Sequence, residues 1–142
     1  EYLKNCKIEA EKYGYTKTLF FRRRYFQDIR SNIPYIKAAA ERMAINAPIQ
    51  GTDADMAKIA MITVHDWIKK QGYEKKIYMI AQVHDELLFE IDEKLVDSVT
   101  ADIQKLMERV LDDFPLKKTL EAVPKVAVLV GVKKGKNWGE TE

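Results

Sequence analysis

The sequence has few of the residues that build covalent or metal-bound frameworks. Its 142 residues include one cysteine, Cys6, and two histidines. A single cysteine excludes an internal disulfide and a cysteine-rich zinc site, and it fits a reducing compartment. At this length the chain amounts to one domain and can bury a hydrophobic core instead.

Long apolar stretches and targeting patterns are also missing. No apolar run approaches the roughly 18 residues that a membrane-spanning helix needs, and no secretory leader is visible. The sequence contains neither internal repeats nor low-complexity segments. The first methionine is Met43, and the chain opens on a helical pattern. We therefore expect it to be a segment of a longer polypeptide.

The chain lacks a large excess of charge of either sign. Its formal net charge is +2, from 24 lysines and arginines against 22 aspartates and glutamates. This balance neither favours nor excludes nucleic acid as a partner. The distribution is more informative, because Arg22-Arg23-Arg24 forms one basic cluster and Lys133-Lys134 with Lys136 forms another.

The apolar periodicity predicts an α+β fold in which helices pack on a small antiparallel sheet. Apolar residues recur at helical spacing in 2–13, from Pro34 to about Lys70, and in 93–112. β-type runs occupy 16–26, 77–83, 87–91 and 126–132. The short gap between the second and third of these runs predicts a β-hairpin with a tight turn at His84-Asp85.

Glycine and proline mark the expected ends of these elements. Gly14 suits the left-handed position that ends the first helix, and Gln71-Gly72 ends the long one. Pro48 lacks a backbone N–H donor, so we expect a break or kink near 47–49 and a new helix start at Gly51-Thr52. The other expected boundaries are a loop at 28–32, a helix stop at Phe114-Pro115 and a final turn at 135–138.

Three ionisable residues, His84, Asp85 and Glu86, interrupt the apolar hairpin at its turn. Strand side chains alternate between faces, so the three share one direction only if the turn twists them. Adjacent carboxylates repel each other and a divalent cation relieves this repulsion; Mg²⁺ takes one or two carboxylates, substrate phosphates and waters. Asp85 and Glu86 are therefore a candidate half of a metal site. A charged turn without a function explains the same residues, because aspartate is common in turns.

Arg42, Asn46 and Gln50 follow one another at intervals of four residues. They share one helix face if the helical phase continues past Pro48. A guanidinium and two amides on one face suit the acceptors that every Watson–Crick pair presents in the minor groove. Such donors test the shape of a base pair without reading its sequence. A solvated polar face, with an amide capping the second helix, is the alternative.

The arginine cluster Arg22–Arg24 lies among aromatic residues. Arginine forks suit phosphate groups, and contacts to a nucleic-acid backbone do not depend on base sequence. A charged edge strand that discourages aggregation would have the same pattern. A second charged dipeptide, His65-Asp66, falls late on the long helix, and we expect it to be a surface pair.

Four stretches, in order, resemble motifs of family A DNA polymerases, the bacterial DNA polymerase I group. The segment TLFFRRRYF (Thr18–Phe26) resembles the family's TLxGRRRY, and AAAERMAINAPIQGTDAD (Ala38–Asp55) resembles AAERxAxNxPxQGTAAD. The segment QVHDELLFE (Gln82–Glu90) resembles the third catalytic motif, and GKNW (Gly135–Trp138) resembles the terminal GxNW. The resemblance covers nearly the whole chain.

The resemblance implies a role for each matching residue. Asp85 would be one of two palm aspartates that bind a catalytic pair of Mg²⁺ ions, with Glu86 as an accessory carboxylate. His84 would lie near the primer terminus. Arg42, Asn46 and Gln50 would contact the DNA in its minor groove. Arg22, Arg23 and Arg24 would contact the DNA backbone.

The resemblance also implies an architecture and a reaction. Residues 1–70 would be helices and arginine-rich strands on the fingers side, and 71–142 the palm hairpin, a helix and a terminal strand. The expected reaction is template-directed transfer of nucleotides from deoxynucleoside triphosphates to the 3′-hydroxyl of a DNA primer. The second palm aspartate and the nucleotide-binding fingers helix lie upstream in the family and are not in this sequence. We therefore expect the chain by itself to be inactive.

Two positions depart from the family pattern. Phe21 stands where glycine is usual, and a phenylalanine would be strained at a positive φ, so we expect this turn to be rebuilt. Asp53 stands where alanine is usual, and it adds negative charge at the expected start of the second helix.

Two other interpretations stay open. A non-catalytic nucleic-acid-binding module would use the Arg22–Arg24 and Arg42–Gln50 surfaces and need no metal at Asp85. A His-Asp phosphohydrolase would need a helical setting for His84, which the flanking β-type runs disfavour. The resemblance further implies a bacterial nucleoid, or an organelle of bacterial origin, as the location, and no membrane as a partner. Exposed surfaces of a partial domain could also drive self-association.

Overall fold

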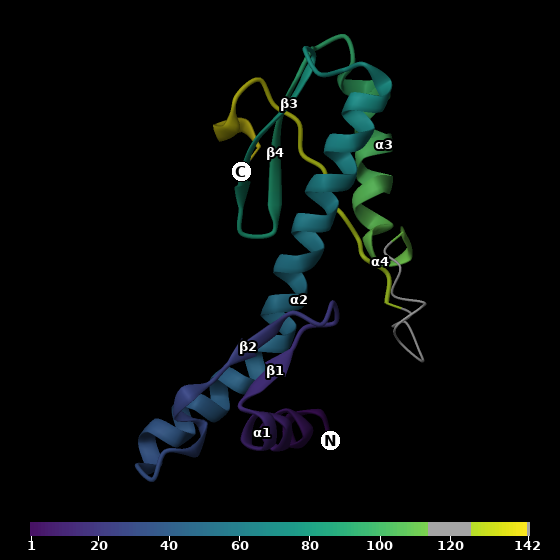
Figure 1. The fold of residues 1–142 in the computed structure, drawn as a ribbon. Coiled ribbons are helices and arrows are strands. Elements are labelled where there is room, and N and C mark those ends of the chain that lie inside the picture. The colour runs from purple at the N-terminus through teal and green to yellow at the C-terminus, as the bar shows by residue number, and fades with distance from the viewer. Residues whose placement is uncertain (114–125, 142) are drawn as a thin grey trace. The chain divides into compact units, whose positions relative to one another are not determined.

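The computed structural model describes residues 1–113 and 126–141, which fall into two compact units, Glu1–Asp55 and Met56–Glu142. The elements, labelled in Figure 1, are α1 (Tyr2–Tyr13), β1 (Tyr15–Lys17), β2 (Arg23–Tyr25), the 3₁₀ helix η1 (Gln27–Arg30), α2 (Pro34–Gln71), β3 (Ile77–Val83), β4 (Glu86–Ile91), α3 (Val96–Glu108), α4 (Val110–Asp113) and the 3₁₀ helix η3 (Trp138–Glu140). Helices and two small antiparallel sheets confirm the predicted α+β class. Among the helices that the structure describes, none has both the length and the apolar character needed to cross a membrane.

The first unit begins with α1, which ends as the sequence predicts. Gly14 adopts a φ of 77°, and its N–H donates to the Ala10 carbonyl at 2.8 Å. The next free carbonyls of the helix end, those of Glu11 and Lys12, each accept a hydrogen bond of 3.0 Å from the Arg30 guanidinium. The helix terminus is therefore satisfied by a glycine cap and a cationic side chain together.

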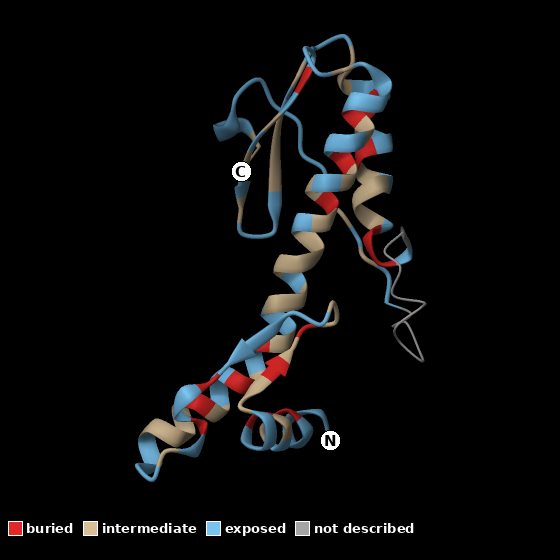
Figure 2. Cartoon of the chain, viewed as in Figure 1, coloured by how far each residue is buried: buried red, intermediate tan, exposed pale blue. Residues whose placement is uncertain are grey.

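The core of this unit is built largely from small residues. Ala40, Ala44 and Ala47 form one stripe of α2 and pack with Ala10, Phe26 and Ile29. In Figure 2 buried positions are red, and several lie along the first part of α2 and on α1. Because alanine side chains are short, α1 and the segment around Phe26 can pack close to the α2 backbone.

The two strands β1 and β2 pair antiparallel beside this core, with Tyr15 opposite Tyr25, Thr16 opposite Arg24 and Lys17 opposite Arg23. The predicted short strands in 16–26 are thereby confirmed. Every residue of β2 is exposed, whereas Thr16 in β1 is buried. The arginine cluster thus occupies an exposed edge.

Of the break or kink predicted near Pro48, the break is wrong, because α2 continues from Pro34 to Gln71 without interruption. Pro48 removes one N–H donor, but Ala44 and Ala47 on the preceding turn are held in the core. One turn later the Thr52 hydroxyl donates to the Pro48 carbonyl at 2.6 Å. Packing on one face therefore outweighs the local cost of the proline. Gly51 and Thr52 lie inside the helix and do not start a new one, while the end at Gly72, with a φ of 70°, is confirmed.

The second unit packs the last part of α2 with α3 and the β3–β4 hairpin. Its core contains Val64 and Ile68 of α2, Ile77 of β3, and Val99 and Ile103 of α3. The pairing of β3 with β4 confirms the predicted hairpin, and its register shifts between Met79 and Ala81. Such an irregularity bends a strand and increases its twist.

Three sequence expectations differ from the structure. Residues 27–30 form η1, which overlaps the expected loop 28–32, and the expected helix 93–112 is divided at Arg109 into α3 and α4. The expected strand 126–132 is not a strand: the Val130 carbonyl accepts from Gln104 Nε2 at 2.8 Å, and its N–H donates to Glu108 Oε1 at 3.3 Å. Side chains of α3 thus satisfy this backbone in place of a neighbouring strand. The expected stop at Phe114-Pro115 lies outside the described residues.

Candidate nucleic-acid interface

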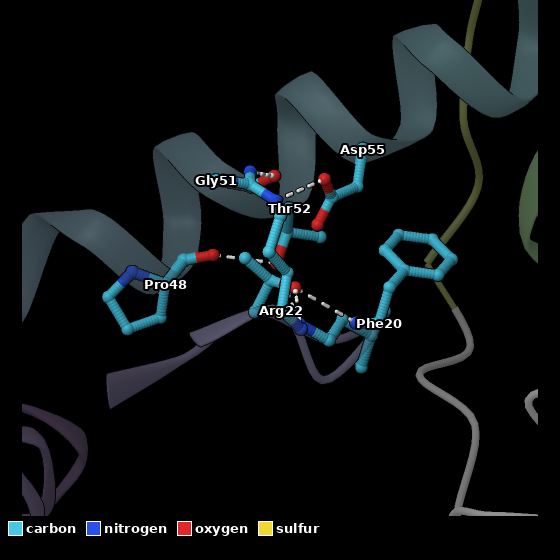
Figure 3. Close-up of polar contacts among 8 residues, drawn as sticks. Phe20, Arg22, Pro48, Gly51, Thr52 and Asp55 are labelled. Carbon is cyan, nitrogen blue, oxygen red and sulfur yellow. Dashed lines mark hydrogen bonds and ion pairs between the residues drawn. The ribbon is translucent and has the colours of Figure 1, made fainter. Parts of the chain in front are cut away.

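The turn between β1 and β2 is fixed to α2 by three hydrogen bonds. Leu19 N–H donates to the Thr52 hydroxyl at 2.9 Å, Arg22 Nε donates to Asp55 Oδ1 at 2.7 Å, and Arg22 Nη2 donates to the Gly51 carbonyl at 2.9 Å. We call Arg22, Gly51, Thr52 and Asp55 the turn latch, and Figure 3 shows its members around the turn. The latch gives a structural role to the glycine at 51, the hydroxyl at Thr52 and the carboxylate at Asp55 on this part of α2.

Gly51 is required by a close approach of the turn to the helix. A β-carbon at Gly51 would lie 2.6 Å from Thr18 Cγ2 and 3.2 Å from an Arg22 guanidinium nitrogen. The first distance is too short for two carbon atoms, so any larger residue would push the turn away from α2. Thr18 is buried and branched at Cβ, and it has little room to move aside.

Thr18 also organises the turn itself. Its hydroxyl accepts from the N–H groups of Phe20 and Arg22 at 3.3 and 3.2 Å, while Phe21 N–H donates to the Thr18 carbonyl at 3.0 Å. Phe21 has a φ of 64°. The expectation that the turn is rebuilt to avoid a positive φ is therefore wrong, and the conformation costs a phenylalanine about 1–2 kcal/mol.

The three arginines of the cluster have different surroundings. Arg22 is committed to the turn latch. The guanidinium of Arg23 lies 4.8 Å from the centre of the Tyr15 ring, and that of Arg24 lies 6.0 Å from the centre of the Phe26 ring. Stacking on an aromatic face orients a guanidinium without engaging all five of its N–H donors. Arg23 and Arg24 are thus better placed than Arg22 to contact phosphates.

An open pocket of about 220 Å³ brings Arg22 and Arg24 of the cluster together with Gln50. Its walls include Lys17, Arg22, Arg24 and Gln50, together with Thr16 and Gly51. The buried Thr16 hydroxyl has no hydrogen-bond partner within residues 1–113 and 126–141. Lys17 was not singled out from the sequence; its position opposite Arg23 in the strand pairing is what adds it to the basic surface.

Arg42, Asn46 and Gln50 lie on an unbroken stretch of α2 and are all exposed. The condition for their sharing one helix face, a continuous phase past Pro48, is therefore met. Arg42 and Asn46 are each two positions beyond a buried alanine of the core stripe, about half a turn round the helix. Arg42 and Asn46 therefore project away from the core, whereas Gln50 lines the pocket beside Arg22 and Arg24.

The hairpin tip carries the second candidate site. His84 has a φ of 53°, and its carbonyl accepts a hydrogen bond of 3.1 Å from Gln82 Nε2. Val83 pairs with Glu86 across the turn, and His84, Asp85 and Glu86 are all exposed. The carboxylates therefore face solvent at the end of a paired hairpin. Gln82, which braces the turn, was not identified from the sequence.

The two hairpin carboxylates fit part of a magnesium site. Within the described residues, no group of three or more histidine, cysteine, aspartate or glutamate side chains could hold a metal ion. Mg²⁺, however, commonly uses only one or two carboxylates from a protein and completes its shell with waters and substrate phosphates. Asp85 and Glu86, both exposed and consecutive in the sequence, could supply those one or two carboxylates.

The His65-Asp66 pair lies on α2, and both side chains are exposed, as expected for a surface pair. His84 lies in a β-turn and not on a helix. The helical setting that a His-Asp phosphohydrolase needs is therefore missing at His84.

Comparison with known proteins places the chain in a family. The family described as DNA polymerase family A matches residues 1–140. DNA polymerase I of Pseudomonas aeruginosa is 40% identical over 140 residues, which cover 98% of this chain and 14% of that protein. DNA polymerase I of Caldicellulosiruptor bescii is 40% identical over 142 residues, or 100% of this chain and 15% of that protein. The chain thus spans about one seventh of the length of these relatives.

The fold is also similar to a solved polymerase structure. A structure described as the POL domain of Pol1 from M. smegmatis in complex with DNA primer-template and dNTP has a TM-score of 0.72 and 41% sequence identity to this chain. The similarity covers 76% of this chain and 19% of that one. Sequence and fold agree over most of the chain, and the chain belongs to DNA polymerase family A.

Proposed function

We propose that this chain is the C-terminal part of the polymerase domain of a DNA-directed DNA polymerase. The reaction would be the transfer of a nucleotide from a deoxynucleoside triphosphate to the 3′-hydroxyl of a primer on template DNA. The observation that carries the proposal is membership of the polymerase family over residues 1–140. The related solved structure, which by its description contains primer-template DNA and dNTP, supports the choice of partners.

Two surfaces of the first unit would bind the duplex. Arg42, Asn46 and Gln50 would donate hydrogen bonds to the base acceptors of the minor groove, which are present in every base pair. Arg23 and Arg24 would contact phosphates, with Lys17 beside them at the pocket. Arg22 would act mainly by holding the turn on α2, because Asp55 and Gly51 already take its donors.

The hairpin tip would supply the metal ligands. Asp85 would bind Mg²⁺, Glu86 would be the accessory carboxylate, and His84 would lie near the primer terminus. When bound, a pair of Mg²⁺ ions would lower the pKa of the primer hydroxyl and stabilise the charge that develops on the phosphate. The contribution of this chain is to present its carboxylates at an exposed tip that the paired strands and the Gln82 hydrogen bond hold in place.

The proposed active site is incomplete in this chain. A second aspartate and the helix that binds the incoming nucleotide would come from the preceding part of the polymerase, so residues 1–70 would belong to the fingers side and 71–142 to the palm. The isolated chain would bind no nucleotide productively and would not extend a primer. The polymerase would act at the bacterial nucleoid or in an organelle of bacterial origin.

The test replaces Asp85 in the polymerase that carries this chain. Asp85→Ala should reduce primer extension by at least about two orders of magnitude, because a metal ligand contributes several kcal/mol to the transition state. Affinity for primer-template DNA should change little. Glu90→Ala removes another exposed carboxylate of the same hairpin and is the matched control, for which normal extension is expected. Undiminished extension by the Asp85 variant would refute the metal role.

A non-catalytic nucleic-acid-binding module is the second candidate. The exposed arginine and amide surfaces favour it as much as they favour a polymerase. It differs in needing no metal at the hairpin. Titration of the protein with Mg²⁺ or Mn²⁺ separates the two, because only the polymerase predicts metal-dependent shifts in the NMR resonances of Asp85 and Glu86. If those resonances respond no more than those of Glu90, the binding module is the better description.

A further inference from the structure

Phe21 is an exposed aromatic residue in a backbone conformation that disfavours it. Its φ is 64°, in the left-handed region, and 43% of its surface is exposed. Within the described residues, only one other non-glycine residue, His84, has a positive φ. Non-glycine residues in this region mark places where the surrounding structure enforces a conformation, and such places are often functional.

The turn does not need the phenyl ring. The backbone at Phe21 is held by its own N–H bond to the Thr18 carbonyl and by the bond from Thr18 N–H to the Arg22 carbonyl. The turn latch then fixes both sides of the turn to α2. Glycine would form the same turn without strain. At 43% exposure the side chain is only partly buried, so burial does not by itself explain why an aromatic residue is present here.

The ring stands in basic surroundings. The neighbouring Arg23 and Arg24 are exposed, and Lys17 pairs with Arg23 across the strands. An exposed aromatic side chain beside a track of cations is the combination with which proteins bind single-stranded nucleic acid. The cations contact the phosphates, and the aromatic face stacks on a base.

We propose that Phe21 stacks on an unpaired base of the bound DNA strand, next to the duplex that the α2 donors contact. This proposal rests on the proposed function as a DNA-binding polymerase segment. A base inside a duplex is covered on both faces by its neighbours, so an aromatic ring can stack only on an unpaired or terminal base. Stacking does not distinguish the four bases, which suits an enzyme that must accept any template.

Two variants without the ring separate binding from stability. Phe21→Ala removes the ring and keeps the strained backbone, whereas Phe21→Gly removes the ring and relieves the strain. In the polymerase that carries this chain, the glycine variant should have a melting temperature a few degrees above that of the alanine variant. Both should bind a primer-template with a single-stranded template overhang about tenfold more weakly than the natural protein. Phe21→Trp should bind it at least as tightly as the natural protein.

The probe is a primer-template whose first unpaired template base is 2-aminopurine, with a blunt duplex of the same paired length as the comparison. The natural protein and the tryptophan variant should quench the 2-aminopurine fluorescence, and the alanine and glycine variants should not. Affinity for the blunt duplex should stay the same in all four. Tyr35→Ala, which removes another exposed ring from this unit, is the control and should leave both affinities unchanged.

Three results would overturn the proposal. Equal overhang affinity in the natural protein and the glycine variant would mean that the ring contacts no base. Normal overhang affinity in Phe21→Gly together with weak affinity in the less stable Phe21→Ala would mean that residue 21 acts only by shaping the turn. A natural protein that binds neither DNA would refute the proposed function itself, and with it this inference.

Discussion

Gly51 and Thr18 are so close that the helix and the turn fit together only because Gly51 has no side chain. A β-carbon at Gly51 would lie 2.6 Å from Thr18 Cγ2. This contact brings the carbonyl of Gly51 within reach of Arg22 and the hydroxyl of Thr52 within reach of Leu19. The position of the arginine cluster relative to α2 therefore depends on one glycine.

Gly51→Ala should destabilise the protein by about 1–3 kcal/mol, because the added methyl group forces Thr18 and the turn away from α2. Thermal or denaturant unfolding measures this loss. Gly131→Ala is the matched control, since a β-carbon there meets nothing within 4 Å, and it should change stability little. Equal effects of the two substitutions would contradict the close approach.

Arg22 and Asp55 should be energetically coupled. Their 2.7 Å ion pair joins an Asp55 side chain that is 11% exposed to an Arg22 side chain that is 49% exposed. A double-mutant cycle with Arg22→Ala and Asp55→Ala should give a coupling energy of about 1 kcal/mol in unfolding. Arg22→Lys should lose most of it, because an ammonium lacks the planar fork that reaches both Asp55 and Gly51. A coupling energy of zero would contradict the role of Arg22 in the turn latch.

Glu41 should make stability depend on pH in the acidic range. The hydrogen bond from Lys7 lowers the pKa of Glu41 from its usual 4.5, and the two side chains lie 2.6 Å apart. The stability that this ion pair contributes is present above the unfolded-state pKa and is lost as pH falls through the lower folded-state value. The difference in melting temperature between the natural protein and Glu41→Gln should therefore shrink as pH falls below 4.5. A difference that stays constant down to pH 2 or so would contradict the lowered pKa.

Asn46 and Arg24 should affect DNA binding in different ways. Asn46→Ala removes a neutral donor and should weaken binding by several-fold, about 1 kcal/mol, at every salt concentration. Arg24→Ala removes a cation and should also reduce the dependence of log K on log salt by about one. Binding isotherms for one primer-template at several salt concentrations measure both effects. An unchanged salt slope for the arginine variant would argue against a phosphate contact.

Much of the architecture could be predicted because its causes are local. Gly14 and Gly72 end their helices in the left-handed conformation that only glycine adopts freely. Apolar β-type runs on both sides of the short gap at His84–Glu86 specified the β3–β4 hairpin. The candidate site residues were likewise identified from spacing and motif; the structure shows that they are exposed, and their binding roles stay predictions.

Other features depend on partners that are distant in the sequence. Pro48 was expected to break α2, but the buried alanines of the same helix and the Thr52 hydroxyl keep the helix continuous. Residues 126–132 have the apolar pattern of a strand, yet the backbone N–H and C=O of Val130 are hydrogen-bonded to the side chains of Glu108 and Gln104 in α3. A local pattern cannot reveal which distant group will satisfy a backbone amide or carbonyl.

The sequence by itself determined the family, the order of the motifs, the ends of the helices and the candidate residues, because side-chain type and spacing carry that information. Only the tertiary structure decided how those residues are held. It assigned Arg22 to the turn latch, joined Gln50 with Lys17 and Arg24 around one pocket, and placed Phe21 at a positive φ. The physical reason is that contacts with α2 override the preference of a single residue, and those contacts exist only once the chain has folded.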